Sequence, residues 1–520
     1  MVTGVTRWST ASKVGECTGT RPRVVLLLGG ASAALYVVDY LAQRGLFLNG
    51  LINAGGAVTS TGLRPGTPAD GSRLVFQAAA LYASTLTLFA LYGWLVFLCQ
   101  RGRLAGRAAW LALLWPILFN LGLLVARPTL SRDLYTYVAH GYLGLTGGNP
   151  YAQPASEVAA TPFGVSLLAA GWLPWHGVTP YGPVWTGIEI AALRLAHQVG
   201  PTVLLLKLLA VAASLTSAWL IWRLLGLVRP QDQLLGTLIY LWNPLIILEF
   251  AGDGHNDALL IACTLAALLA AVQLRPTGAL AGLVLGALVK FWPLMLLPAF
   301  VVYLHYGRRD RRNLAALLVL GLAGLGLAVL LYRVFWLGGA TFAAVPEGGQ
   351  RAVTASLSGA LVWGFAHILP PTRAAWAVTL LLDGFFVVSM LLLSRQARDA
   401  DGFLRACGLI VTLYLLTAAP VYWSWYATLP IALLALTPRG SASALIIVLA
   451  LGARLVAPLD VLYENHFIIW PVSAVATTLV GAIMPLAALL SWWTLHWRRE
   501  PATRLALASE DIRYHGHTST

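Results

Sequence analysis

The stretch "AAWLALLWPILFNLGLLVA", from Ala108 to Ala126, decides the class of fold. It carries no charged side chain, and its length matches the roughly 20 apolar residues that a helix needs to cross a bilayer. Similar runs recur, such as "VVLLLGGASAALYVVDYL" from Val24 to Leu41. Backbone polar groups in lipid must be paired within helices or closed barrels, and these runs lack the alternation of barrel strands. They therefore predict an all-α, polytopic membrane protein.

The composition indicates the same class. Of 520 residues, 58% are hydrophobic and only 10% are charged, whereas an ordinary domain has about 25% charged residues. We expect about 13 to 15 transmembrane helices within residues 23–495, between cytoplasmic tails at 1–22 and 496–520. The apolar run after Arg23 is long for a signal peptide and contains Asp39, so an uncleaved first helix is favoured.

The net charge of +14 does not indicate nucleic-acid binding, because the basic residues cluster in short loops such as "RGRLAGR" (Arg101–Arg107) and "GRRDRR" (Gly307–Arg312). Such clusters are typical of cytoplasmic loops. Counting from them, residues 127–183 form a long extracytoplasmic loop, and the late segments Ala419–Tyr426 and Leu459–Phe467 lie on the same side. The four cysteines are scattered without metal-binding spacing, so we expect neither a metal nor another cofactor.

The sequence leaves the side of the middle region open. Residues Val184–Val199 contain Glu189, Arg194 and His197, which is polar for a spanning helix. If this segment spans, the motif "DGHND" (Asp253–Asp257) falls inside; if it lies along the interface, the motif falls outside. A helix break near "KFWP" (Lys290–Pro293) would reconcile the second arrangement with cytoplasmic arginines.

The outer loop begins with "SRDLYTYVAHGYLGLTGGNPY", Ser131 to Tyr151. Asp133 at the membrane boundary is either a helix cap or a functional carboxylate. An acid, aromatic residues and a fixed turn together favour a sugar site, because aromatic faces pack on sugar C–H groups and a carboxylate accepts a hydroxyl proton. The candidate binding residues here are Arg132, Tyr135, Tyr137, His140, Asn149 and Tyr151, with Tyr181 from "TPYGPVW" at the loop's end.

A second polar cluster, "LWNPLIILEFAGDGHNDALL" (Leu241–Leu260), lies between apolar runs, where ionisable residues are costly and are functional candidates. Its candidates are Asn243, Glu249, His255, Asn256 and Asp257. Lys290 follows deep in an apolar run. It either snorkels to the interface, pairs with a carboxylate, or holds the phosphate of a lipid substrate. The late outer loops add Trp423, Trp425, Tyr426, Glu464 and His466.

Together these motifs resemble the GT-C superfamily of membrane mannosyltransferases, and among them the actinobacterial polyprenol-phosphate-mannose-dependent α-1,6-mannosyltransferases. The resemblance is carried by "SRDLYTYVAHGYLGLTGGNPY", "TPYGPVW", "NPLIILEFAGDGHNDAL", "LVKFWP" and "YWSWYATLP", over about Ser131 to Pro430. It implies a catalytic carboxylate in the first long outer loop, which is Asp133 here. Many members have a second acid beside or one residue from it, whereas this chain has Arg132 before Asp133 and no second acid nearby.

The resemblance implies an inverting transfer of mannose from a polyprenyl-phosphate mannose donor to a mannan or lipoglycan acceptor on the outer face of the plasma membrane. Asp133 would take the proton of the acceptor hydroxyl. Two alternatives stay open: a GT-C enzyme for another sugar or acceptor, and a transporter or flippase for a lipid-linked sugar. The lack of an evident internal repeat argues against a transporter.

Overall fold

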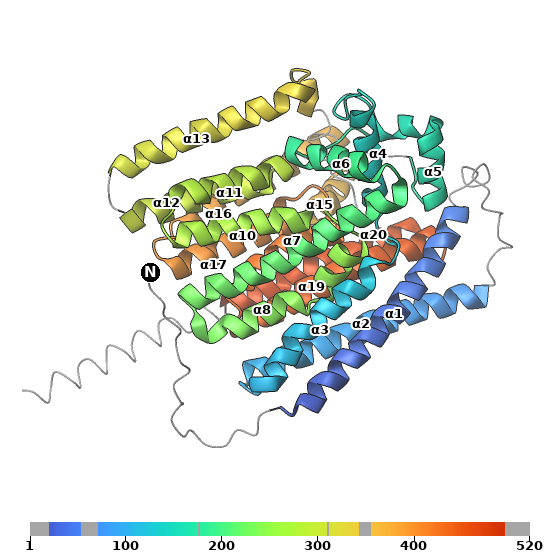
Figure 1. Ribbon diagram of the computed structural model, residues 1–520, viewed down its shortest axis with the longest axis horizontal. Helices are drawn as coiled ribbons and strands as arrows, with labels where there is room; N and C mark the ends of the chain where they lie inside the picture. The colour runs from blue at the N-terminus through green and yellow to red at the C-terminus, as the bar shows by residue number, and fades with distance from the viewer. Residues whose placement is uncertain (1–19, 54–70, 175–176, 309–310, 343–354, 495–520) are drawn as a thin grey trace, which may run out of the picture.

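The structure is a computed structural model that describes residues 20–53, 71–174, 177–308, 311–342 and 355–494. In these residues the chain forms helices joined by turns and no β-strand, which confirms the all-α fold (Figure 1). The α-helices are α1 (Pro22–Asn53), α2 (Gly71–Gln100), α3 (Gly106–Leu124), α4 (Asp133–Leu145), α5 (Pro162–Ala170), α6 (Pro183–Ala196), α7 (Val199–Val228), α8 (Gln233–Leu241), α9 (Pro244–Ile247), α10 (Asp257–Val272), α11 (Pro276–Val289), α12 (Leu297–Arg308), α13 (Arg311–Tyr332), α15 (Leu357–Phe365), α16 (Pro371–Ser394), α17 (Ala400–Leu413), α18 (Thr428–Leu434), α19 (Ser441–Glu464) and α20 (Trp470–Thr478).

Short 3-10 and π elements connect or extend these helices. The 3-10 elements are η2 (Ala155–Ala160), η3 (Pro230–Asp232), η5 (Trp292–Leu296), η6 (Arg333–Phe335), η7 (Ala340–Phe342) and η9 (Ser424–Ala427). The π elements are η4 (Leu248–Gly252), η8 (Tyr414–Ala418) and η10 (Leu479–Ile483). The tails predicted at 1–22 and 496–520 lie almost wholly outside the described residues.

Eight helices in the described residues are long and apolar enough to cross a membrane, or nine if the bent pair Pro230–Leu241 and Pro244–Gly252 is one span. Four other apolar helices in this part of the chain have only 10–17 residues, whereas α13 has 22 residues. Of the expected 13 to 15 transmembrane helices, eight or nine in the described residues reach the length of a full crossing. The helices Asp257–Val272 and Pro276–Val289 are apolar, but each is shorter than the roughly 20 residues that a full crossing needs.

The apolar run Ala108–Ala126 forms α3, which contains Pro116. Proline has no backbone N–H, so the carbonyl of Ala112 one turn earlier loses its helical partner. The indole Nε1–H of Trp242 donates to this carbonyl instead. The helix thus stays intact in an apolar environment because a neighbouring element supplies the missing donor.

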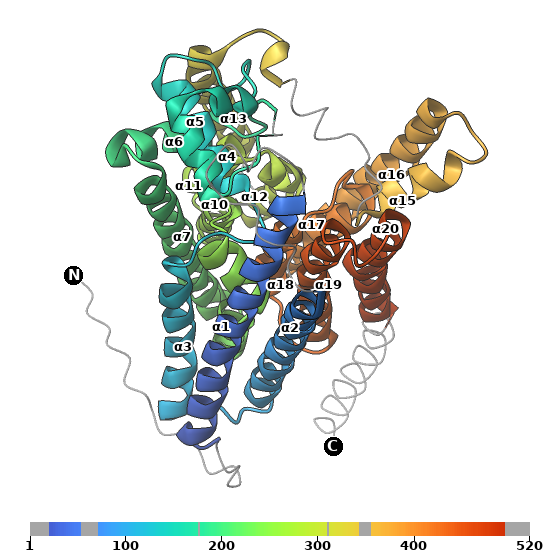
Figure 2. The same ribbon diagram turned by 90° about the vertical axis from the view of Figure 1, so that its right-hand side faces the viewer.

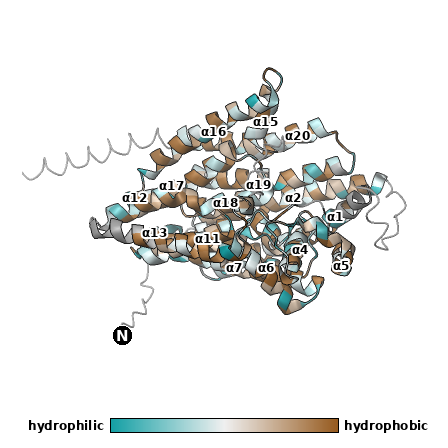
Figure 3. Cartoon of the chain, turned by 90° about the horizontal axis from the view of Figure 1, so that it is seen from above, coloured by the Kyte–Doolittle hydropathy of each residue, from teal (hydrophilic) through white to brown (hydrophobic). Residues whose placement is uncertain are grey.

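The outward faces of the helices are apolar. Val329 on α13 and Leu380 on α16 are among many large exposed hydrophobic side chains, and hydrophobic residues line the outer helices when the molecule is seen from above (Figure 3). Such surfaces are too large for a soluble protein and fit contact with lipid.

The two ends of the helix bundle differ in composition. At one end, which we name the site end, α4, α5 and α6 gather beyond the last turn of α3 (Figure 2). At the opposite end, which we name the basic end, α3 begins next to the arginines of the α2–α3 turn. A cavity of about 400 Å³ there is lined by this turn at Gly102 and by Asp232 and Arg439.

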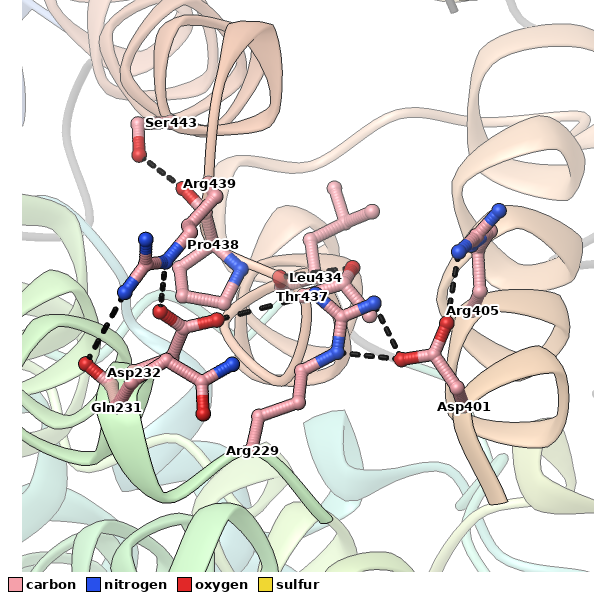
Figure 4. Close-up of polar contacts among 10 residues, drawn as sticks. All are labelled: Arg229, Gln231, Asp232, Asp401, Arg405, Leu434, Thr437, Pro438, Arg439 and Ser443. Carbon is pink, nitrogen blue, oxygen red and sulfur yellow. Dashed lines mark hydrogen bonds and ion pairs between the residues drawn. The ribbon is translucent and has the colours of Figure 1, made fainter. Parts of the chain in front are cut away.

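Arginines and aspartates form an ion-pair network at the basic end (Figure 4). Arg229 and Arg405 pair with Asp401, and Arg439 pairs with Asp232. The network ties the end of α7 to the start of α17 and to the turn before α19. It gathers arginines from segments far apart in the sequence at one end of the molecule.

The structure places "DGHND" at the site end. Residues 183–196 form α6, which is not of spanning length and packs against α4, α7 and α11. The next helix, α7, runs to the basic end, and the bent pair of helices returns from there. The arrangement in which residues 184–199 cross the membrane is therefore wrong, and Asp253–Asp257 lies at the same end as Asp133.

The break at "KFWP" reverses the chain. Lys290 follows α11 directly, and η5 leads into α12, which runs back to the basic end. A Cβ at Gly307 would lie 2.7 Å from the side chain of Leu274, in the turn between α10 and α11. The basic run that starts at Gly307 thus begins at the basic end, as the break was expected to allow.

Candidate active site

Asp133 is the first residue of α4 and is partly exposed. The N-cap position belongs to Arg132, whose side chain makes no capping hydrogen bond, and the backbone N–H of Asp133 donates to Ser131 Oγ at 3.2 Å. Asp133 is therefore not the cap residue of α4, which was the alternative reading of its position. Its carboxylate lies at the positive end of the helix dipole, where a negative charge is stabilised.

Tyr181 links the end of the segment 127–183 to its beginning. Its hydroxyl donates to Asp133 Oδ2 at 3.4 Å and lies 3.4 Å from the hydroxyl of Tyr137 on α4. The two tyrosine rings are nearly perpendicular, with centroids 5.3 Å apart, and Trp185 of α6 packs edge-on against Tyr137 at 5.1 Å. Burial raises the pKa of both tyrosines well above the usual range, so both hydroxyls keep their protons and can donate.

The "DGHND" turn packs directly against α4. Gly254 has φ +72°, and a Cβ there would lie 3.0 Å from Leu134, the residue after Asp133. Only glycine adopts this conformation without a steric penalty and allows such a close approach. The turn also receives a hydrogen bond from the α3–α4 connection, because the N–H of Thr129 donates to Asp253 Oδ1 at 3.0 Å. The two polar motifs of the sequence therefore meet at one place.

Within this turn, His255 is fully buried between a carboxylate and an indole. Its Nε2 lies 3.2 Å from Glu249 Oε2, and its ring stacks on Trp425 with centroids 4.1 Å apart. Burial lowers the pKa of His255, but Glu249, together with the charges of Asp133 and Asp253, outweighs it, and the pKa is raised above the usual value. The amide of the neighbouring Asn256 is buried without a hydrogen-bond partner in the described residues.

Lys290 forms an ion pair with a carboxylate of the same motif. Its Nζ lies 3.0 Å from both carboxylate oxygens of Asp257, and the side chains are 11% and 2% exposed. The ammonium also lies 4.5 Å from the ring centroid of Tyr426 and 6.0 Å from that of Tyr181. Of the three readings of Lys290, the structure shows pairing with a carboxylate, in a cage of aromatic rings.

The loop before α18 supplies the aromatic wall of the site. Trp423 and Trp425 are stacked in parallel at 5.4 Å, and Trp423 is 40% exposed. Tyr426 packs against Trp292, two residues after Lys290. An exposed indole next to buried charged groups is a suitable face for the apolar side of a sugar ring.

Several other predicted residues shape the segment 127–183. His140 Nε2 lies 3.4 Å from the carbonyl of Gly177. The Asn149 side chain accepts from the N–H of Tyr151 at 3.0 Å, and the Tyr151 hydroxyl donates to the carbonyl of Tyr181 at 2.9 Å. These contacts hold Tyr181 against the start of the loop. The residues therefore stabilise the position of Tyr181 rather than lining the site themselves.

The remaining predicted residues lie apart from this group. Tyr135 is buried two positions from Tyr137, on a different face of α4. Asn243 caps α9 in the middle of the bent span, where its side chain accepts from the N–H of Leu245 at 3.0 Å. His466 is exposed in the turn after α19, and the side chain of Glu464 lies outside the described part of the chain.

Residues that the sequence reading missed lie behind the site. Lys207 of α7 is buried and donates to the carbonyl of Leu123 at 2.9 Å. Asp39 of α1 and Arg454 of α19 form a buried ion pair at 2.8 Å. Charged residues inside apolar runs are the signal that would have found them. Among the described residues, no group of three or more His, Cys, Asp or Glu side chains is arranged to hold a metal ion.

Comparisons with known proteins give relatives of one kind. A family profile described as "Alpha-(1->6)-mannopyranosyltransferase, N-terminal domain" matches residues 26–306, more than half of the chain. A Corynebacterium glutamicum protein named alpha-(1->6)-mannopyranosyltransferase A is 27% identical over 246 residues, 43% of this chain and 48% of that protein. A Mycobacterium tuberculosis protein of the same name is 27% identical over 334 residues, 58% of this chain and 61% of its own length. The chain thus spans about half to three fifths of the length of these curated relatives. No solved structure gives a significant match.

Proposed function

Because the chain belongs to the α-(1→6)-mannopyranosyltransferase family, we propose that it is a GT-C mannosyltransferase that adds α-1,6-linked mannose to a mannan or lipoglycan. The donor is a polyprenyl-phosphate mannose, whose lipid tail stays in the bilayer. The observation that carries the proposal is the meeting of Asp133, Tyr181 and the Lys290–Asp257 pair at the site end of the helix bundle.

Asp133 is the general base of this reaction. It accepts the proton of the acceptor hydroxyl while the hydroxyl oxygen bonds to the anomeric carbon. The bond from that carbon to the phosphate oxygen breaks, and polyprenyl phosphate leaves with the electron pair. Attack opposite to the phosphate converts a β-linked donor into an α-linked product. One carboxylate is enough, because phosphate leaves without protonation, whereas a glycosidase needs two carboxyl groups.

The neighbouring residues orient the base and the sugar and balance charge. Tyr181 donates to Asp133 Oδ2 and so fixes the direction of the carboxylate. Trp423 offers its exposed face to a mannose ring. Lys290 provides positive charge for the departing phosphate, and its contact with Asp257 holds the ammonium in place before the donor binds.

The distribution of arginines supports an extracytoplasmic site. Arginines gather at the basic end, which corresponds to the cytoplasmic side under the positive-inside rule. Asp133 lies at the other end, so acceptor glycans outside the cell reach it from water while the donor approaches from lipid.

Replacement of the base tests the function. We expect Asp133→Asn, purified in nanodiscs with radiolabelled polyprenyl-phosphate mannose and a mannan acceptor, to lose about 10²- to 10⁴-fold in kcat, because a positioned general base contributes that much. Donor binding should persist. Linkage analysis of the wild-type product should give α-1,6 bonds.

The matched control is Glu157→Gln, which removes an exposed carboxylate from the same outer loop. It should transfer mannose like the wild type. Near-normal turnover by Asp133→Asn would refute the role of the base. Movement of the donor across vesicles by the wild type, without any transfer, would indicate a flippase instead.

A further inference from the structure

A chain of buried polar side chains crosses the bundle to the α3–α4 connection, residues 125–132. Its members are Arg454 (α19), Asp39 and Gln43 (α1), Thr129 (the connection) and Asp253 (the "DGHND" turn), each no more than 5% exposed. Arg454 donates to Asp39 Oδ2 at 2.8 Å, and the Gln43 amide N–H donates to the same carboxylate. Ser84 and Thr85 of α2 donate to Asp39 Oδ1 at 3.2 and 3.0 Å.

Gln43 and Thr129 are the junction of this chain. The hydroxyl of Thr129 donates to Gln43 Oε1 at 2.7 Å, and the N–H of Thr129 donates to Asp253 Oδ1 at 3.0 Å. Because the Gln43 nitrogen is taken up by Asp39, its oxygen must face Thr129. Thr129 is thereby held from two sides, by α1 and by the second polar motif.

The same connection is anchored at its other points. Lys207 donates to the carbonyls of Leu123 and Ala126, where α3 ends. The N–H of Arg127 donates to the hydroxyl of Tyr40 at 3.3 Å. Asp133 is four residues beyond Thr129, so the path from the last turn of α3 toward the proposed base is anchored at several points up to Thr129.

Burying such a network in a membrane protein has a free-energy cost. A buried ion pair between spanning helices pays for the desolvation of both charges, and apolar residues of similar size often give equal or greater stability. Hydrogen-bonded polar networks inside a core do, however, hold one arrangement of it. The part of the molecule that this network holds is the connection that ends at Asp133.

We propose that Gln43 and Thr129 are positioning residues that fix the α3–α4 connection and thereby the place of the Asp133 carboxylate. The inference rests on the proposed function, in which Asp133 takes the acceptor proton. Gln43 and Thr129 act through Asp133: their contact sets the distance between the base and the reacting hydroxyl.

The test removes one hydroxyl. Thr129→Val abolishes the hydrogen bond to Gln43 and keeps the backbone N–H that Asp253 accepts. In the mannose-transfer assay we expect kcat to fall about tenfold or more, with the KM for the donor within about twofold. A small displacement of a base slows the chemical step without weakening ground-state binding. Thr129→Ser keeps the hydroxyl and should retain kcat to within about threefold.

A double-mutant cycle tests whether Gln43 and Thr129 act through their mutual contact. Gln43→Met has a similar size and lacks both hydrogen-bonding groups. If Gln43 and Thr129 act through their mutual contact, Gln43→Met/Thr129→Val should be no slower than the worse single variant. If the losses of kcat in the two single variants multiply in the double variant, the two residues do not act through their mutual contact. If Gln43→Met does not fold, the Val and Ser variants of Thr129 decide alone.

The matched control is Thr87→Val on α2, where an exposed threonine hydroxyl donates only to its own helix at Ala83, 2.7 Å away. It should leave kcat and KM unchanged. Wild-type kcat in Thr129→Val, a raised KM with unchanged kcat, or an equal loss in Thr129→Ser would each overturn the inference. A wild-type protein that transfers no mannose would instead overturn the proposed function.

Discussion

Single residues in the site take their chemistry from their partners. His255 is buried, which by itself favours the neutral ring, yet the carboxylate of Glu249 at 3.2 Å and the charges of Asp133 and Asp253 raise its pKa above the usual value. The carboxylates around His255 therefore favour its imidazolium form over the neutral ring. In the proposed reaction, a cation stacked on Trp425 beside the base would add positive charge near the departing phosphate.

The charge of His255 predicts a pH dependence. A raised pKa means that the cation is present below that pKa and is lost as the pH rises through it. If the cation supports transfer, kcat should fall on the alkaline side. Glu249→Gln removes a group that raises the pKa, so this fall should move to lower pH. The measurement is a pH–rate profile of both proteins, with Glu157→Gln as control. Superimposable alkaline limbs for Glu249→Gln and wild type would contradict the prediction.

At the scale of elements, the site exists because segments come unusually close. Gly182, which follows Tyr181, donates its N–H to the carbonyl of Val289 at 3.0 Å. A Cβ at Gly182 would lie 2.1 Å from the carbonyl oxygen of Leu288. The start of α6 thus packs backbone to backbone on the end of α11. This contact brings Tyr181 within reach of Lys290.

Gly182→Ala tests this approach. The added methyl group meets backbone that is unable to rotate away, so α6 and α11 must separate. We expect a loss of about 1–3 kcal/mol in stability, as for overpacked cores, and at least a tenfold drop in mannose transfer. The control is Gly187→Ala on α6, where a Cβ meets no atom within 4 Å. It should be neutral or slightly stabilising. Equal thermal unfolding and turnover in both variants would show that the close contact is unimportant.

The sequence predicted individual helices better than the contacts between them. Charge and hydropathy located the first three long helices and placed Asp133 at the start of the segment that follows them, because these signals are local. The Lys290–Asp257 pair joins residues 33 positions apart, and Arg454 and Asp39 are 415 apart. No local pattern encodes such contacts. The side of "DGHND" stayed open for the same reason, since it depends on how α6 packs.

For the whole molecule, the separation of charge between the ends is the main organising feature. Arg229, Arg405 and Arg439 meet at one end through Asp232 and Asp401. The proposed base and its partners occupy the other. A substrate with a lipid tail and a polar head fits this arrangement, because the helices offer an apolar outer face and the proposed base and its partners lie at one end of the bundle.

The orientation of this axis in the membrane is testable by labelling. In a protein whose four cysteines are replaced by alanine, Glu157→Cys places a thiol on an exposed position of the outer loop, and Gln100→Cys places one at the basic end. If the basic end is cytoplasmic, a membrane-impermeant maleimide should label only Glu157→Cys in intact cells and should label both after permeabilisation. Both proteins should keep mannose transfer, since neither residue touches the site.

Labelling of Gln100→Cys alone in intact cells would place Asp133 in the cytoplasm. The acceptor and donor would then have to meet on the cytoplasmic face, because the site and the basic end are fixed at opposite ends of the same helices.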